Sequence, residues 1–135
     1  MGFSTGACMA GILTAILERN GSCDFQKERL DANHPPLLFT ICFSGFKLTH
    51  PKFRSLYLDQ IQTPMLHLTG IYDFWIPQSQ TYKLAEICVN GELVSFEGTH
   101  YVPGDPFVVR KVIEFIKESL GWKYEPNQAD GWIDI

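Results

Sequence analysis

Apolar and polar residues follow one another along this chain in blocks that predict alternating helices and strands. The first block, Thr5–Glu18, is apolar on almost every side and rich in small residues, which predicts a helix buried against a sheet. Asn20-Gly21 is expected to end that helix. Residues 21–36 are polar and predict a surface loop or a short irregular helix.

Three apolar runs predict strands. Leu37–Phe43 is continuously apolar between Pro35-Pro36 and Ser44-Gly45, as is typical of a strand buried on both faces in a parallel sheet. Met65–Gly70 predicts a second buried strand and Glu92–Phe96 a third. The segment between the first two strands is mixed, and its apolar residues are expected to cap a pocket or to pack on the sheet: Phe46, Phe53, Leu56, Tyr57 and Leu58.

Two later segments predict helices. Pro77 suits the first position of a helix that runs to about Cys88. Asp105 suits a helix N-cap and is followed by proline at the first helical position. The helix beyond it is amphipathic and ends at Gly121, with one apolar side formed by Val108, Val109, Val112, Ile113, Ile116 and Leu120.

The order of these elements predicts an α/β fold, with about three parallel strands flanked by helices. Composition agrees with one globular domain, because the chain has 135 residues and is 45% hydrophobic. The net charge of −4 and the scattered Lys and Arg residues offer no basic face for nucleic acid or for anionic lipid. No long apolar span or secretory leader is visible, so no membrane partner is expected.

Four cysteines, Cys8, Cys23, Cys42 and Cys88, are too far apart for C-x-x-C zinc ligation. Cys8 and Cys42 lie in apolar segments and are expected in the core. A reducing compartment, the cytoplasm, is the simplest expectation.

The most informative short motif lies at the start of the chain. Gly2-Phe3-Ser4-Thr5-Gly6 fits G-x-S-x-G, the nucleophile elbow, in which a serine occupies a tight strand-to-helix turn. Side chains two positions away on either side of that serine are expected to collide, so glycine is expected to be needed at both. Only Met1 precedes the motif, so the strand that normally leads into it is expected to be absent.

Two further polar residues follow predicted strands. Asp73 lies after the second strand and His100 after the third. Ligand sites of parallel α/β sheets gather at the carboxyl ends of the strands, and Ser, Asp, His is the chain order of α/β-hydrolases. The chemistry needs all three groups, because imidazole must take the proton of the serine and a carboxylate must orient the imidazole.

Each of these residues has competitors or a simpler explanation. Ser4 could be a helix N-cap, and Asp73 a turn residue. Asp59 and Asp105 compete for the acid role, although Asp105 is better explained as an N-cap. His34 and His50 precede prolines in loops, whereas His67 lies in a buried strand as a core histidine.

With these motifs in place, the chain resembles the fungal serine-hydrolase (FSH) family of the α/β-hydrolase superfamily, which includes esterases and thioesterases. The segments that carry the resemblance are Gly2–Ala7, Phe43–Phe46, Ile61–His67, Gly70–Pro77 and Glu97–Pro103. The resemblance implies Ser4 as nucleophile, Asp73 as orienting acid and His100 as general base. It implies the backbone amide of Thr5 as one oxyanion donor, and Phe43–Phe46 as a strand-exit motif beside the active site.

Family members are longer, so residues 1–121 are expected to form the carboxyl-terminal part of such a hydrolase domain, with its amino-terminal strands missing, and residues 122–135 a tail. The expected reaction is cleavage of a carboxylic ester or thioester through an acyl-serine intermediate. The alternative is an inactive remnant that only mediates interactions. An exposed sheet edge is expected to allow pairing with another chain or self-association.

An acyl pocket is a further expectation, with aromatic candidates Phe46, Phe53, Tyr57, Phe74, Trp75 and Tyr101, although most such residues belong to a core. A triad needs no metal and no organic cofactor, so none is expected. A nucleotide-binding domain also fits alternating strands and helices, but the chain lacks G-x-G-x-x-G after a strand and lacks a P-loop.

Overall fold

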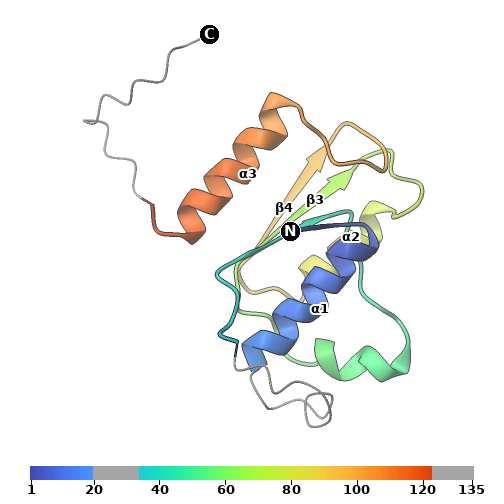
Figure 1. The fold of residues 1–135 in the computed structure, drawn as a ribbon. Coiled ribbons are helices and arrows are strands. Elements are labelled where there is room, and N and C mark those ends of the chain that lie inside the picture. The colour runs from blue at the N-terminus through green and yellow to red at the C-terminus, as the bar shows by residue number, and fades with distance from the viewer. Residues whose placement is uncertain (20–33, 123–135) are drawn as a thin grey trace.

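The computed structural model describes residues 1–19 and 34–122, and these form a parallel four-stranded sheet with helices on both faces (Figure 1). The strands lie side by side in chain order, β1–β2–β3–β4. Their bounds are Gly2–Phe3 (β1), Thr40–Phe43 (β2), Met65–Gly70 (β3) and Gly91–Phe96 (β4). The helices are α1 (Thr5–Arg19), the 3₁₀ helix η1 (Pro51–Tyr57), α2 (Gln78–Ala85) and α3 (Pro106–Ser119).

The fourth strand, β1, corrects the expectation that nothing leads into the Ser4 turn. Gly2 pairs with Cys42 and Phe3 with Phe43, so two residues suffice to form a parallel edge strand. The other edge of β1 is open among the described residues, because β1 is the first strand in the sheet order.

Strand β2 is shorter than the apolar run from Leu37 predicts. Its pairing with β3 begins at Thr40 and Met65, and the Thr40 amide donates to the carbonyl of Pro64. Pro64 has no N–H with which to extend the ladder, so the sheet cannot continue beyond this point. Leu38 consequently lies outside the sheet and is exposed.

Helix α2 also ends earlier than expected, at Ala85 rather than near Cys88, and it begins at Gln78 with Pro77 as its N-cap. The residues after α2 form an isolated parallel bridge between Ile61 and Cys88. The Ile61 amide donates to Ile87, and the Val89 amide donates to Ile61. The Ile87 and Cys88 amides still make turn hydrogen bonds to Leu84 and Ala85, so the chain leaves α2 through a tight turn into this bridge.

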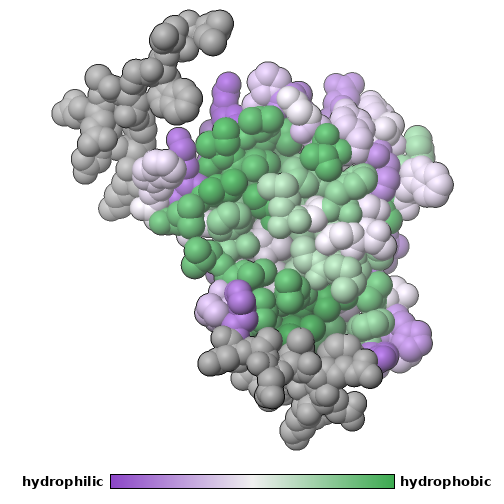
Figure 2. Space-filling model, in the orientation of Figure 1, coloured by the Kyte–Doolittle hydropathy of each residue, from purple (hydrophilic) through white to green (hydrophobic). Residues whose placement is uncertain are grey.

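Both α1 and α3 leave part of their apolar surface exposed to solvent. Helix α1 was expected to be buried against the sheet, yet Met9 and Leu13 are exposed. On α3, Val109 and Ile113 are exposed, and so is Leu120 just beyond the helix, whereas the buried face centres on Val108 and Phe115. Figure 2 shows hydrophobic residues gathered on the face that presents α1 and α3, around the N-terminal strand.

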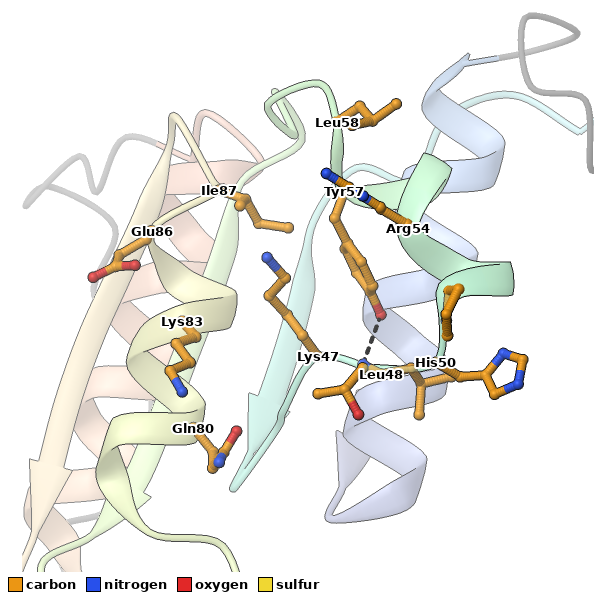
Figure 3. A pocket seen from close by; sticks show the side chains of 12 residues that line it. Lys47, Leu48, His50, Arg54, Tyr57, Leu58, Gln80, Lys83, Glu86 and Ile87 are labelled. Atoms are coloured by element: carbon orange, nitrogen blue, oxygen red, sulfur yellow. Dashed lines mark hydrogen bonds between the residues drawn. The ribbon is translucent and has the colours of Figure 1, made fainter.

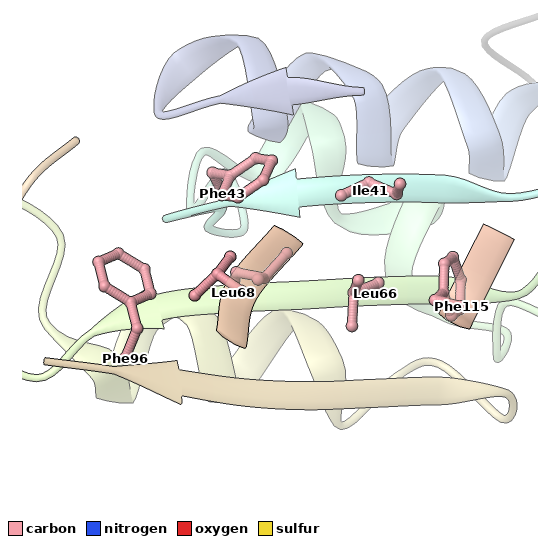
Figure 4. Close-up of a cluster of buried hydrophobic side chains, with 7 residues drawn as sticks. Ile41, Phe43, Leu66, Leu68, Phe96 and Phe115 are labelled. Atoms are coloured by element: carbon pink, nitrogen blue, oxygen red, sulfur yellow. The ribbon is translucent and has the colours of Figure 1, made fainter. Parts of the chain in front are cut away.

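The sheet has a hydrophobic core on each face. Facing α3, alternate residues of β2, β3 and β4 pack with that helix (Figure 4): Ile41, Phe43, Leu66, Leu68, Phe96, Val108 and Phe115. On the other face Ala7 and Ala15 of α1 pack against Cys42 and Met65. Helices therefore pack against both faces of the sheet, and this packing positions the strand ends.

The mixed segment after β2 contains η1 and forms a third apolar cluster with α1. Leu56 is fully buried there beside Cys8, Ile12 and Ile16, and Phe46, Phe53 and Tyr57 pack around them, whereas Leu58 is exposed. The predicted burial of Cys8 and Cys42 is confirmed, and both are free thiols, as is Cys88.

Two sequence predictions lie outside the described residues: the structure of residues 20–33, with Cys23, and the tail beyond Trp122. Within the described part of the chain, no helix has the length and hydropathy needed to cross a membrane.

Candidate active site

All four strands deliver polar residues to the same edge of the sheet. Phe3 pairs with Phe43, and Phe43 pairs with Leu68, so the carboxyl ends of β1 and β2 lie level with each other beside β3. Ser4 and Ser44 are the first residues beyond β1 and β2. Both have left-handed backbone conformations, with φ of 54° and 49°, which residues other than glycine seldom adopt.

Each of these serines is held by one backbone hydrogen bond to the neighbouring strand. The Ser4 amide donates to Phe43 at 2.9 Å, and the Ser44 amide donates to Leu68 at 2.8 Å. These bonds extend the sheet by one residue while the chain turns away. The turn at Ser4 leads directly into α1, as the strand–turn–helix of a nucleophile elbow requires.

The side chains of Ser4, His100 and Asp73 form a continuous hydrogen-bonded chain. His100 Nε2 lies 3.0 Å from Ser4 Oγ, and His100 Nδ1 lies 2.8 Å from Asp73 Oδ2. The three residues follow β1, β4 and β3, so the sheet brings together groups that are far apart in sequence. The imidazole also packs against the ring of Phe3, with ring centroids 4.6 Å apart and the two planes tilted by 40°.

The carboxylate of Asp73 is buried and fully hydrogen bonded. Its Oδ1 accepts the backbone amides of Trp75 and Ile76, at 3.0 and 2.9 Å. Its Oδ2 accepts the hydroxyl of Ser44 at 2.7 Å in addition to facing His100. Burial alone would raise the pKa of this carboxyl group, but the hydrogen bonds from His100, Ile76 and Ser44 and the charge of His100 lower it below 3.8.

Ser44 is a site residue whose contact the sequence did not reveal. The sequence placed it in a motif beside the site, but its hydrogen bond to Asp73 became visible only with the fold. A signal was present nonetheless, because Ser44 is the first residue after an apolar strand, as Ser4 is after Phe3. Its hydroxyl is wholly buried, so it is a structural part of the site and not a surface group.

Glycines let the backbone segments at this edge approach one another. A Cβ on Gly2 would collide with the backbone of Gly6 and Ala7, as expected for an elbow. The expectation for Gly6 was wrong, because a Cβ there would meet nothing within 4 Å. Gly6 lies in the first turn of α1 and is exposed, which explains the open space.

Gly70, at the end of β3, is a close contact that the sequence did not indicate. A Cβ there would lie 2.5 Å from the carbonyl oxygen of Thr99 and 2.6 Å from that of Gly98. Those two residues directly precede His100, so the backbone at Gly70 sets how closely the His100 loop approaches the Asp73 loop.

The other candidate site residues occupy different positions. Thr5 is exposed at the start of α1, where first-turn amides have no acceptor within the helix. Phe46 and Trp75 line one cavity of about 300 Å³. Phe74 is 87% exposed, and Tyr101 packs edge-on against Phe96. Phe74 and Tyr101 are not among the residues that line this cavity.

The competing acids and histidines lie elsewhere. Asp59 is exposed and faces Arg19, and Asp105 caps α3 by accepting the amides of Phe107 and Val108, as expected. His34 and His50 are exposed. Among the described residues, no group of three or more side chains is placed to hold a metal ion.

His67 is fully buried on β3, as expected, but its ring has no hydrogen-bond partner among the described residues. The nearby hydroxyl of Thr69, on the same face of the strand, also has none. Desolvation lowers the pKa of the His67 imidazole from 6.5 to about 4, so this ring is neutral at physiological pH.

A family model described as Serine hydrolase (FSH1) matches residues 1–112. The chain belongs to this serine hydrolase family. That assignment agrees with the resemblance carried by the elbow and the strand-exit motifs.

The curated proteins that are similar to this chain include proteins from yeasts and insects. "Family of serine hydrolases 3" of Saccharomyces cerevisiae is 32% identical over 138 residues, covering 99% of this chain and 49% of that protein. "Esterase AAEL000016" of Aedes aegypti is 26% identical, covering 96% and 43%. A Schizosaccharomyces pombe protein named "Dihydrofolate reductase" is 31% identical over 103 residues, covering 76% and 21%.

Solved structures confirm an α/β-hydrolase fold that is only partly represented here. Acyl-protein thioesterase 2 of Zea mays matches with a TM-score of 0.62 and 19% identity, covering 89% of this chain and 55% of the thioesterase. The chain spans 39–54% of the length of the curated relatives named as esterases or serine hydrolases.

Proposed function

We propose that this family member hydrolyses a carboxylic ester or thioester, with Ser4 as nucleophile, His100 as general base and Asp73 as orienting acid. The observation that carries the proposal is the relay in which His100 lies 3.0 Å from Ser4 Oγ and 2.8 Å from Asp73 Oδ2. These are distances at which a proton can pass from the hydroxyl to the ring as the nucleophile attacks.

In the first half of the reaction, Ser4 Oγ adds to the acyl carbon while His100 Nε2 takes the hydroxyl proton. Asp73 holds Nδ1–H and stabilises the imidazolium that results. His100 then returns the proton to the departing alcohol or thiol, which leaves an acyl-serine. In the second half, water attacks the acyl carbon with His100 again as base, and the carboxylic acid product and free Ser4 are released.

The negative charge that develops on the substrate oxygen must be stabilised by a hydrogen-bond donor. The Thr5 amide is suited to this role, because Thr5 is the first residue of α1 and follows Ser4 directly. Its N–H lies at the N-terminus of the helix, which is the positive end of the helix dipole. In this proposal Ser44 acts on the acid and not on the substrate, since its hydroxyl is bonded to Asp73.

A fluorophosphonate probe tests the proposal on the chain as it is. We expect the probe to phosphonylate Ser4, with the modified residue identified by peptide mass spectrometry. Ser4→Ala should abolish labelling, whereas Ser79→Ala, which changes an exposed serine of α2, should leave it intact. A folded chain that stays unlabelled, or equal labelling of the Ser4→Ala variant, would refute the assignment of Ser4.

A second candidate function is an interaction module without turnover, and the exposed apolar face supports it. The open edge of β1 lies between α1, which exposes Met9 and Leu13, and α3, which exposes Val109 and Ile113 (Figures 1 and 2). Unpaired strand edges flanked by apolar side chains readily accept another strand. A second copy of this chain is the partner that we propose.

Sedimentation equilibrium tests this candidate. We expect reversible self-association of the wild type, which Leu13→Glu should weaken, because the substitution places a charge on the exposed apolar face. Leu58→Glu is the matched control, since Leu58 is exposed but lies beyond η1. A wild-type protein that is monomeric at all concentrations would refute self-association.

We place the protein in the cytoplasm and its reaction on a small-molecule substrate. Free thiols at Cys8, Cys42 and Cys88 support a reducing compartment. Cell fractionation of a tagged chain would test this location, and recovery in a secreted fraction would refute it.

A further inference from the structure

A basic pocket lies apart from the hydrogen-bonded site, between η1 and α2 (Figure 3). It has a volume of about 600 Å³ and is lined by residues that follow β2 and by residues of α2. Three of the lining side chains are cationic, Lys47, Arg54 and Lys83, and one is acidic, Glu86. This concentration of positive charge stands out in a chain whose net charge is −4.

Within residues 1–19 and 34–122, no carboxylate pairs with the cations of the pocket, Lys47, Arg54 and Lys83. In Figure 3, Lys47 and Arg54 extend into the gap between α2 and η1, whereas the carboxylate of Glu86 points away from it. Uncompensated cations around a cavity attract an anion, and a guanidinium group can bind a phosphate through two parallel hydrogen bonds.

The pocket is also held in shape by specific contacts. The Leu48 amide donates to the hydroxyl of Tyr57 at 3.1 Å, which fixes the tyrosine as one wall. Lys47 Nζ lies 5.0 Å from the centre of the Tyr57 ring, at cation–π distance. The central cation is therefore positioned before any ligand binds, which lowers the entropy that binding would cost.

The basic pocket continues toward the candidate active site. A second cavity of about 300 Å³ shares Lys47, Leu48, Thr49 and Gln80 with it and reaches Trp75 and Ile76. The backbone amides of Trp75 and Ile76 are the groups that bind Asp73 Oδ1. A ligand lying along both cavities would thus extend from the cationic side chains to the loop that holds Asp73.

We propose that this groove binds the phosphate-bearing end of the ester or thioester substrate, with Lys47, Arg54 and Lys83 around the phosphate and Trp75 against the uncharged part next to it. The proposal rests on the hydrolase function given above and adds a substrate class to it. A phosphate monoester fits three cations better than a carboxylate does, because it carries up to two negative charges and three acceptor oxygens.

Phosphate binding can be measured without any hydrolysis. In titrations with phenyl phosphate followed by amide NMR shifts, we expect saturable shifts at Leu48, Thr49 and Gln80. The triple variant Lys47→Ala, Arg54→Ala, Lys83→Ala should weaken this binding at least tenfold. The matched control removes three cations of α3, in Arg110→Ala, Lys111→Ala, Lys117→Ala, and should bind as the wild type does.

The outcomes separate this proposal from the hydrolase proposal. Loss of binding in both triple variants would overturn the pocket, because it would reflect overall charge only. Benzoate binding as tight as phenyl phosphate at equal ionic strength would overturn phosphate as the ligand class. If Ser4 is never labelled but phenyl phosphate binds as described, the hydrolase proposal fails while the phosphate site stands.

The link to turnover is tested with a pair of esters that differ only in a terminal phosphate or hydroxyl. We expect the pocket variant to raise the KM of the phosphorylated ester at least tenfold and to leave that of the neutral ester unchanged. Equal effects on both esters would overturn the role of the pocket in substrate binding.

Discussion

The hydroxyl of Ser44 donates a hydrogen bond of 2.7 Å to Oδ2 of Asp73, the same carboxylate oxygen that faces His100. Ser44 follows β2 and His100 follows β4, and these strands lie on either side of β3, the strand that precedes Asp73. The Ser44 hydroxyl therefore helps to orient the Asp73 carboxylate and to lower its pKa.

We expect Ser44→Ala to slow fluorophosphonate labelling of Ser4 about tenfold, which corresponds to ~1.4 kcal/mol of transition-state stabilisation. Without the Ser44 hydrogen bond, the pKa of Asp73 rises from its lowered position, so the part of the pH–rate profile in which labelling is lost through protonation of Asp73 should move to higher pH. Ser95→Ala, at an exposed serine of β4, is the control and should change neither property.

A third variant separates the hydroxyl from the backbone. Ser44→Gly also lacks the hydroxyl but adopts a φ of 49° without strain. It should therefore show the same shift in the pH–rate profile as Ser44→Ala, with higher stability. Wild-type labelling by the glycine variant would contradict a role for the hydroxyl.

The buried His67 should make stability fall in mild acid. The pKa of His67 is 6.5 in the unfolded chain and about 4 in the folded protein. Below pH 6.5 the unfolded chain therefore binds a proton that the folded protein does not bind until the pH approaches 4. At 1.36 kcal/mol per unit, the lost stability reaches roughly 3 kcal/mol between pH 7 and pH 4.

Urea unfolding across this pH range measures the effect. His67→Leu should remove it, because leucine has no proton to gain and leaves no unpartnered nitrogen atoms. His34→Gln, at an exposed histidine, should keep the acid dependence of the wild type. An unchanged slope in His67→Leu would show that other groups cause it.

Gly70→Ala should displace the loop that carries His100. The added Cβ would lie 2.5 Å from the Thr99 carbonyl oxygen, and relief of this overlap should cost about 2 kcal/mol of stability. Labelling of Ser4 should fall by about 10²-fold if the imidazole moves by about 1 Å. Gly104→Ala, where a Cβ meets nothing within 4 Å, should have little effect on either measurement.

The two glycines of the elbow should respond to alanine in opposite directions. Gly2→Ala should destabilise the protein, because its Cβ collides with backbone atoms of Gly6 and Ala7. Gly6→Ala should stabilise it by about 0.5–1 kcal/mol, since alanine favours the helical first turn and has room there. Thermal unfolding of both variants checks this contrast, and destabilisation of both would contradict it.

Much of the fold could be predicted from the sequence, since the signals involved are local. Pro64 and Gly70 bracket β3, and Asp105-Pro106 marks the start of α3, so these elements were found where expected. The meeting of Ser4, Asp73 and His100 at one edge was expected because each follows a predicted parallel strand and because the three occur in the chain order Ser, Asp, His. Boundaries set by pairing were missed, as at Ile61 and Cys88, whose bridge ends α2 early.

Features that depend on distant contacts could not be predicted. The face of α3 that is buried depends on how the helix lies on the sheet, so Phe115 was missed and Ile113 was wrongly placed with the buried set. The Ser44–Asp73 bond requires knowledge of strand register. The cations of the basic pocket lie on separate segments, which only the packing of η1 near α2 brings together.

The relay also has a consequence for folding. Ser4 and His100 are 96 residues apart in the sequence and lie 3.0 Å apart in the structure. Contacts of such large sequence separation form late, because the long intervening segment must be closed before they are made. The proposed labelling of Ser4 requires both residues in place, so we expect it to appear only once β1 and β4 have joined one sheet, and a labelling time course during refolding checks this.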